Sequence, residues 1–284
     1  MIFISTGGFY NRNAYQTSLE FQQNEIYNIE LSGGIFESSL IPNLKSLASE
    51  LNFQIHNYFP PPSNPFVFNL ASLNPDISKR SFEHALNSIQ VASEIGKGFY
   101  SFHAGFLLDL DVNELGKKVK KRRINDRSKA LQVFLDNVNK LAKVAEAKGI
   151  KLLIENNVIS AGNYAEFKED PFLMTQSEEC IEVMNAVPSN VKMLVDLAHL
   201  KVSSYSLKFD AIDFLRKCDL WISAYHLSDN DGTRDSNQPF SEDSWFWPYL
   251  KKDLNYYSIE VYTNNFVVLK KQKILLEKFL KTEQ

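Results

Sequence analysis

Acidic and imidazole side chains recur in this sequence at the ends of short apolar segments. The clearest case is the segment 191–196, which closes with Asp196 and is followed three positions later by His199. Other such segments close with residues of the same two kinds, namely His56, His103, Glu155, His226 and Glu260. Carboxylates and imidazoles together are typical ligands of Mn²⁺, Co²⁺, Fe²⁺ or Zn²⁺. The pattern therefore predicts a site for one or more divalent metal ions.

The histidines and acids of this pattern allow other interpretations as well. Four of the five histidines belong to the pattern: His56, His103, His199 and His226. The fifth, His84, falls inside a predicted helix and has no expected role. The acids would repel one another in one site unless a cation neutralised them. A hydrogen-bonded polar plug without metal is the alternative, and Asp196 alone is also typical of a residue that caps the next helix.

The segments that carry these residues alternate with helical ones. Short apolar runs typical of buried strands cover residues 2–5, 27–31, 53–56, 99–103, 150–155, 191–196, 220–226 and 256–261. Helical segments are predicted between and after them, at 13–24, 40–51, 76–95, 128–148, 176–187, 208–218 and 264–281. Helical crossovers force parallel strand pairing, and eight such units close a (β/α)8 TIM barrel. We therefore expect an α/β fold with one TIM-barrel domain over residues 1–284, whose strand ends share one mouth.

An open, doubly wound sheet is the alternative arrangement of such units. It would need fewer strands and usually begins with a glycine-rich turn of the form GxGxxG. This chain has Gly7 and Gly8 after its first predicted strand, but not that pattern. The closed barrel is therefore favoured.

Composition bounds the class of protein and its partners. The 284 residues are 44% hydrophobic and 23% charged, as in an ordinary soluble globular protein. A formal net charge of −3 does not favour nucleic acid or an anionic membrane as a partner, although it leaves room for a local basic groove. Two cysteines, Cys180 and Cys218, lie in predicted helices and indicate a reducing compartment. Without a leader-like start or a bilayer-spanning apolar run, the sequence predicts a cytoplasmic protein that makes no membrane contact.

Several short motifs resemble those of one family of TIM barrels. The motifs are Phe102-His103-Ala104-Gly105, Ile154-Glu155-Asn156-Asn157, Asp196-Leu197-Ala198-His199, His226-Leu227-Ser228-Asp229-Asn230-Asp231-Gly232 and Ile259-Glu260-Val261. Together with the alternating architecture, they resemble the xylose isomerase-like superfamily, which holds sugar isomerases and epimerases as well as endonuclease IV. The resemblance to the epimerases implies one divalent ion that is bound by four residues and that holds the substrate oxygens. Those residues would be Glu155, Asp196, His226 and Glu260.

The same resemblance implies residues that bind substrate. His199 would contact a sugar, and Arg234, in the loop after the seventh strand, would bind a substrate oxygen. Asp229 and Asp235 from that loop are assigned to the substrate as well. The expected partner is a small-molecule sugar or sugar phosphate, and a homo-oligomer is compatible with the resemblance.

Endonuclease IV binds three zinc ions with a wider set of ligands, and this chain matches much of that set. His56 and His103 would be available for a second ion. Asp235 fits the next ligand, but the Asp-x-His pattern of that enzyme reads Asp235-Ser236-Asn237 here. Asparagine is a poor zinc ligand, which weakens the case for a third ion.

Two kinds of chemistry would use this site. Removing a proton next to a carbonyl needs a base and a cation that stabilises the enediolate, and Glu155 and Glu260 fit a base and an acid on opposite faces of the substrate. Phosphodiester cleavage would instead need an activated water and several basic loops along a duplex, whereas the sequence has one basic run, at 117–123. We expect a metal-dependent sugar or sugar-phosphate isomerase or epimerase. The alternatives are an abasic-site endonuclease and a lyase-type or non-catalytic relative.

Overall fold

The strand segments of the sequence form a closed ring. In a computed structural model, which describes residues 1–114 and 117–282, neighbouring strands pair in parallel in sequence order, and the last pairs with the first. The strands are β1 (Ile2–Ser5), β2 (Asn28–Leu31), β3 (Asn52–His56), β4 (Gly96–His103), β5 (Lys151–Glu155), β6 (Val191–Asp196), β7 (Ile222–Leu227) and β8 (Tyr256–Ile259). The predicted TIM barrel is confirmed. The largest difference at a strand end is in β4, which begins at Gly96 instead of residue 99.

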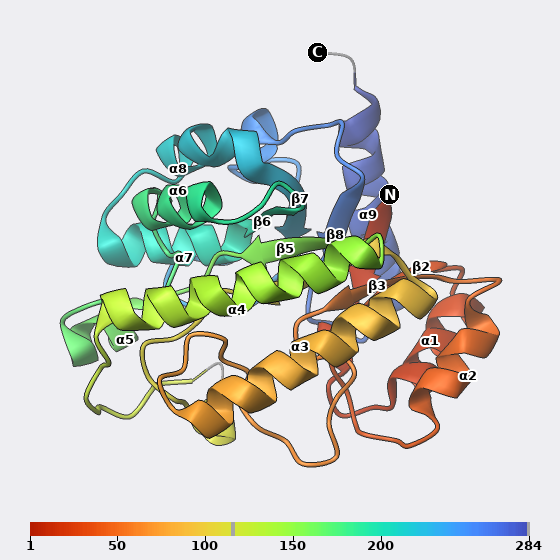
Figure 1. The fold of residues 1–284 in the computed structure, drawn as a ribbon. Coiled ribbons are helices and arrows are strands. Elements are labelled where there is room, and N and C mark those ends of the chain that lie inside the picture. The colour runs from red at the N-terminus through yellow and green to blue at the C-terminus, as the bar shows by residue number, and fades with distance from the viewer. Residues whose placement is uncertain (115–116, 283–284) are drawn as a thin grey trace.

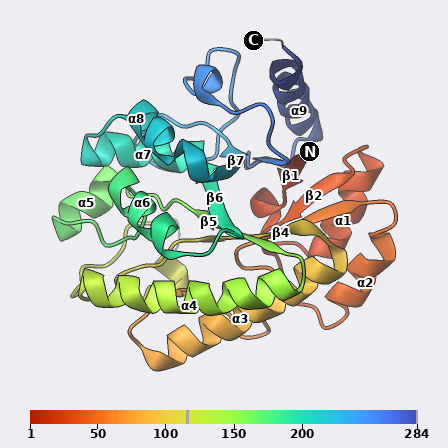
Figure 2. The ribbon, with the colours of Figure 1, turned by 45° about the horizontal axis from the view of Figure 1, so that its top comes forward.

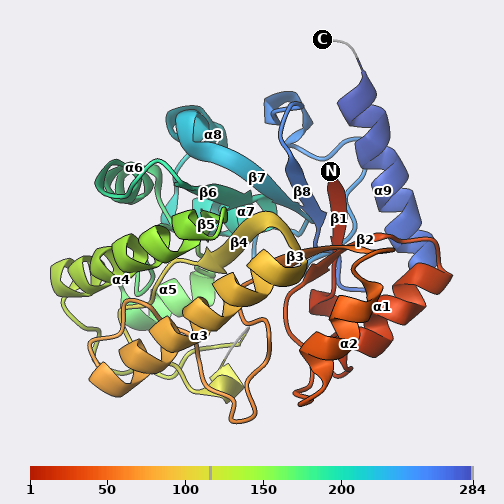
Figure 3. The same cartoon turned by 45° about the vertical axis from the view of Figure 1, so that its right-hand side comes forward.

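Helices surround this ring on its outer face. They are α1 (Ala14–Gln23), α2 (Leu40–Leu47), α3 (Pro75–Ile95), α4 (Arg127–Ala147), α5 (Ala161–Phe167), α6 (Ser177–Ala186), α7 (Leu197–Leu207), α8 (Ala211–Cys218) and α9 (Phe266–Lys281). Figure 1 shows α3 and α4 side by side on one flank. Figures 2 and 3 show α9 beside β1, which closes the ring of helices. In the described part of the chain, no helix has both the length and the apolar character needed to cross a membrane.

Two of these helices, α5 and α7, were not predicted. The helix α5 has only seven residues, too few for a clear periodic pattern. The helix α7 is buried on several sides, with Leu197, Ala198, Leu200 and Val202 all inaccessible to solvent. Its polar residues Ser203, Ser204 and Ser206 are buried as well and do not form one exposed face, so the sequence lacks the amphipathic period that identifies a surface helix.

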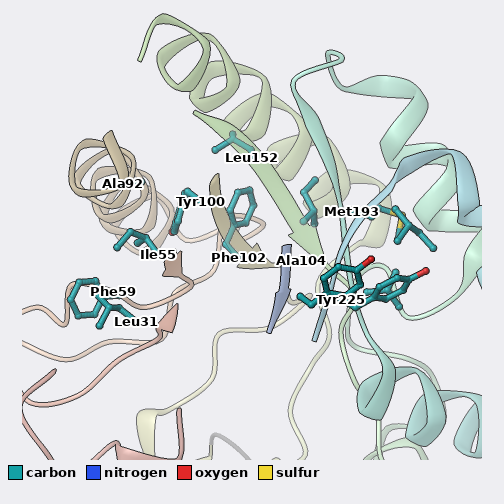
Figure 4. Packing of buried hydrophobic residues seen from close by; sticks show 14 of the residues in the cluster. Leu31, Ile55, Phe59, Ala92, Tyr100, Phe102, Ala104, Leu152, Met193 and Tyr225 are labelled. Carbon is teal, nitrogen blue, oxygen red and sulfur yellow. The ribbon is translucent and has the colours of Figure 1, made fainter. Parts of the chain in front are cut away.

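Buried side chains fill two regions that the barrel wall separates. Side chains on the outer face of the strands, such as Ile55 and Tyr100, pack against helix α3 around Ala92 (Figure 4). A smaller apolar cluster belongs to the barrel interior and comprises Phe3, Leu153, Leu194, Ala224 and Tyr256. Side chains alternate along a strand, so residues two positions further on point into the barrel as well. On β5, β6 and β7 these residues are Glu155, Asp196 and His226.

Close packing at Gly105 positions the loop that follows β4. A Cβ atom at this position would collide with the Cβ of Ala71 and lie 3.0 Å from its backbone nitrogen. We expect Gly105→Ala to lower the free energy of unfolding by about 1–3 kcal/mol, the usual cost of overpacking. Gly162→Ala is the matched control, because a Cβ there would meet nothing nearer than 4.0 Å and alanine favours the helix. Denaturant unfolding measures both variants, and parental stability of Gly105→Ala would contradict this reading of the loop.

Candidate metal and substrate site

The side chains predicted from the strand ends meet at one mouth of the barrel. Four of them are the final residues of their strands: His56, His103, Glu155 and Asp196. His226 is the penultimate residue of β7, and Glu260 follows β8 directly, with its N–H donating to the Leu227 carbonyl at 3.0 Å. The strand register places His103 beside Glu155 and Asp196 beside His226. All six are buried except His103, whose side chain is 25% exposed.

The tightest group surrounds the Nδ1 atom of His226. This nitrogen lies 2.9 Å from Glu260 Oε2, 3.3 Å from Glu155 Oε1 and 3.8 Å from Asp196 Oδ2. One donor atom from each of the four residues lies within 4.8 Å of the other three. Three carboxylates and an imidazole form a donor set that suits a divalent transition metal. We call these four residues the primary group.

Several polar atoms of the primary group have no hydrogen-bond partner among the described residues. They include both carboxylate oxygens of Glu155, Oδ2 of Asp196 and Nδ1 of His226. A buried polar atom without a partner carries a desolvation cost, and a divalent cation would supply the missing interactions for all of these atoms at once. The residues present therefore fit a divalent ion.

A second group adjoins the first and shares Glu155 with it. Glu155 Oε2 lies 3.4 Å from His56 Nε2 and 3.4 Å from His103 Nδ1. These three residues again offer donor atoms within 4.8 Å of one another. The two oxygens of Glu155 therefore face different groups, which is the arrangement of a carboxylate that could bridge two ions.

The sequence analysis missed Glu30, a buried acid on β2. Its Oε2 accepts a hydrogen bond from Nε2 of His226 at 2.9 Å and another from the phenol of Tyr256. Both partners are fully buried, as is Glu30 itself. The available signal was the charged residue in the apolar segment Asn28–Leu31, which matches the other strand ends.

Two further residues orient the primary group, and neither had been assigned a role. The Tyr262 hydroxyl donates to Glu260 Oε1 at 3.2 Å. The side chain of Asn156 accepts from the Asp196 N–H at 2.8 Å and donates to the Asp196 carbonyl at 3.2 Å. These contacts hold Glu260 by its side chain and Asp196 by its backbone.

The two central acids have opposite electrostatic environments. Burial would raise the pKa of Glu155, but attraction to His103 and the other nearby histidines holds that pKa well below its ordinary value. Burial raises the pKa of Asp196 to about 8; attraction to His199 lowers it in part, and repulsion from Glu155 adds to the increase. Without a cation, Asp196 therefore holds a proton near neutral pH.

The pKa values of two histidines of the site are also shifted in opposite directions. Burial opposes protonation of His226, but Glu30, Glu155 and Glu260 raise its pKa well above the ordinary value. At His103, burial outweighs the attraction of Glu155 and lowers the pKa to about 4. A metal ion that binds at His226 Nδ1 must displace a proton, so metal affinity is expected to increase with pH.

His199 lies at the rim of the site, on the first turn of α7. Its backbone N–H donates to Asp196 Oδ1 at 2.7 Å, and its ring Nδ1 lies 2.9 Å from the Asn156 carbonyl. Asp196 therefore caps the helix with Oδ1, which confirms the capping interpretation, and turns Oδ2 to the primary group; its role as a metal ligand stays a prediction. The Nε2 atom of His199 lies 3.3 Å from Asp235 Oδ2, which brings Asp235 to the rim as well.

The structure does not bring Asp229 and Arg234 into the group of candidate ligands. The carboxylate of Asp229 accepts from Lys201 Nζ at 2.7 Å and from the Ser244 hydroxyl at 2.9 Å. Arg234 is exposed in the loop after β7. Their roles toward a substrate stay predictions.

The comparison with protein families identifies the fold family of this chain. The model of the xylose isomerase-like TIM barrel family matches residues 27–264, most of the sequence. The chain belongs to the xylose isomerase-like TIM barrel family, as the motifs had indicated. No curated protein matches it.

Solved structures of the same fold include several sugar epimerases. A D-tagatose 3-epimerase-like protein has a TM-score of 0.74 and 19% identity, over 99% of this chain and 97% of that one. The D-psicose 3-epimerase of Clostridium cellulolyticum H10, solved with D-tagatose, has a TM-score of 0.63 and 13% identity over 98% and 95% of the two chains. The IOLI protein, solved with a zinc atom, has a TM-score of 0.68 and 14% identity over 99% of each chain. At these identities the likeness establishes the fold.

Proposed function

We propose that this protein is a metal-dependent isomerase or epimerase of a sugar or sugar phosphate. The observation that carries the proposal is the primary group, in which Glu155, Asp196, His226 and Glu260 bring buried donor atoms within 4.8 Å of one another. A divalent ion bound there would stabilise the negative charge that develops on substrate oxygens as a proton leaves the adjacent carbon. The family and its epimerase neighbours support this assignment.

The two glutamates of the primary group would move the protons. Glu155 ends β5 and Glu260 follows β8, three strands further around the ring, so the two carboxylates approach a bound substrate from different sides. One would take a proton from carbon and the other would return one to the opposite face. The hydroxyl of Tyr262 donates to Oε1 of Glu260 and would keep that carboxylate oriented. We propose that His199, Asp235, Asp229 and Arg234 contact the substrate from the rim.

An abasic-site endonuclease is the second candidate, and the group of His56, His103 and Glu155 favours it. A second ion there would enlarge the site toward phosphodiester chemistry. The basic run at 117–123 gives less support, because its charges have local partners. Lys118 lies 2.7 Å from Glu166, and Arg122 pairs with Glu114. Fewer free charges remain for a phosphate backbone.

One assay separates these candidates. Protein purified without chelator is analysed for bound metal and incubated, with Mn²⁺, Co²⁺ or Zn²⁺, with a panel of ketoses, their phosphates and an abasic duplex DNA. We expect bound divalent metal and turnover of a sugar or sugar phosphate. An Asp196→Ala protein prepared in parallel should lose both, which assigns the activity to this chain. Metal-dependent cleavage of the duplex with no sugar turned over would overturn the proposal.

A further inference from the structure

Glu30 is an acidic residue in a fully buried position, which is unfavourable for a carboxylate. It lies in the barrel wall on β2, beside Gln54 of β3 in the strand register, and is fully buried. Burying a carboxylate costs several kcal/mol unless partners compensate it. In the described residues its partners are His226 and Tyr256, both acting on Oε2, while Oε1 has none. The function of the metal site described above does not by itself require this residue.

The two ring nitrogens of His226 face different partners. Nε2 lies 2.9 Å from Glu30 Oε2, and Nδ1 lies 2.9 Å from Glu260 Oε2 within the primary group. A neutral imidazole carries one proton, and only the other nitrogen can bind a metal. An ionised carboxylate accepts hydrogen bonds and donates none, so Glu30 requires the proton at Nε2. When a metal ion displaces the proton from Nδ1, the proton that Glu30 holds at Nε2 is therefore the one that stays on the ring.

Tyr256 and Ser101 extend this contact beneath the site. The Tyr256 phenol donates to the same oxygen of Glu30. Tyr256 belongs to β8 and Glu30 to β2, so this hydrogen bond reaches across β1, which lies between the two strands. The Ser101 hydroxyl lies next to that phenol and 2.9 Å from His56 Nδ1. We call Glu30, Tyr256 and Ser101 the buried polar layer. One histidine from each candidate metal group contacts it, His226 through Glu30 and His56 through Ser101.

We propose that Glu30 is a positioning residue that fixes His226 in the tautomer whose Nδ1 binds the metal. The inference rests on the proposed function only in assuming a divalent ion at the primary group. Glu30, His56 and His226 also have donor atoms within 4.8 Å of one another, as in a metal site of their own. The direct 2.9 Å contact between Nε2 and Oε2 leaves no room for an ion between these atoms and favours the hydrogen bond.

Glu30→Gln tests this role with nearly the same side-chain shape. A neutral amide oxygen accepts the Nε2 proton more weakly than a carboxylate does, and an amide that turns its NH₂ group toward Nε2 favours the tautomer with the proton on Nδ1, which blocks metal binding there. We expect the affinity for Co²⁺, measured by titration of visible absorption, to fall about 10- to 100-fold at an unchanged number of ions bound. In the Zn²⁺-loaded parent, ¹⁵N-histidine NMR should show His226 protonated at Nε2, and this signal should weaken or move in the variant.

Two variants serve as comparisons. Tyr256→Phe keeps the carboxylate–imidazole contact and should lose less affinity than Glu30→Gln. Glu114→Gln removes another ion-paired carboxylate, one that pairs with Arg122 and belongs to none of the candidate metal groups among the described residues, and should bind Co²⁺ as the parent does.

The outcomes separate this inference from the proposed function. Parental affinity and an unchanged His226 signal in Glu30→Gln would overturn the positioning role alone. The loss of one whole ion would overturn it too, because Glu30 would then be a ligand. A parent protein that binds no Co²⁺ or Zn²⁺ would overturn the proposed function and this inference together.

Discussion

Glu260→Gln should lower turnover of the sugar substrate at least about 10²-fold while the protein still binds metal. The amide preserves the shape of the side chain but removes the charge that accepts a proton. Glu155→Gln should lose at least as much, and it should also bind metal more weakly, because Glu155 Oε1 and Oε2 face the two candidate metal groups. The measurement is kcat together with the metal content of the same samples.

Solvent exchange shows which proton transfer survives in each variant. If the two glutamates act on opposite faces, each single variant keeps one base and should still exchange one substrate proton with deuterated solvent. The surface variant Glu242→Gln, whose carboxylate pairs with Lys278, provides the control and should turn over like the parent. Near-parental kcat in a metal-loaded Glu155→Gln or Glu260→Gln protein would remove that residue from the proton transfer.

Without metal, the protein should lose stability as the pH rises from about 6.5 to about 8. Burial raises the pKa of Asp196 to about 8, so the folded state holds a proton that the unfolded chain has released. His226 and His199, despite their burial, also have raised pKa values because of the acids around them. In this window the folded state therefore binds more protons at all three residues, and each contributes up to about 1.4 kcal/mol of lost stability per pH unit.

Three groups oppose this trend, and metal should reverse it. Burial lowers the pKa values of His84 and His103 to about 4, so these residues are neutral in the folded state while the unfolded chain still binds protons there near pH 6.5. Burial lowers the pKa of the Met1 amino group, which contributes stability as the pH rises. The unfolded histidines release these protons early in the window, so a net loss remains, visible as a Tm several degrees lower at pH 8 than at pH 6.5 in the presence of chelator. With saturating Zn²⁺ the ion replaces these protons, so the slope should flatten or change sign. A chelated protein that gains stability over this range would contradict the described electrostatics.

The fold was predictable because its signals are local and repeated. Each strand is a short apolar run, and the number of alternating units specifies a closed ring rather than an open sheet. The same regularity predicted which side chains share a mouth, since parallel strands direct their carboxyl ends to one face. Asp196, His226 and Glu260 could be grouped from this rule alone.

The unpredicted parts depend on contacts between distant segments. Because the polar residues of α7 do not form one exposed face, its register was not assigned, and so Lys201 was not recognised as the partner that binds Asp229. Glu30 lies 196 residues before His226 in the chain. Only the closed ring brings these two side chains together, and no local pattern in the sequence specifies that pair.

The pairing of β8 with β1 gives the order in which the site could form during synthesis. Glu30, Glu155, Asp196 and His226 all leave the ribosome before Glu260, which follows the final strand. Until that strand pairs with both β7 and β1, the nascent sheet has two free edges and its acids lack their last neighbour. Closure of the ring and completion of the candidate ligand set are therefore one late event, so a chain stalled before β8 would display an acidic, open-edged intermediate of the kind that chaperones bind.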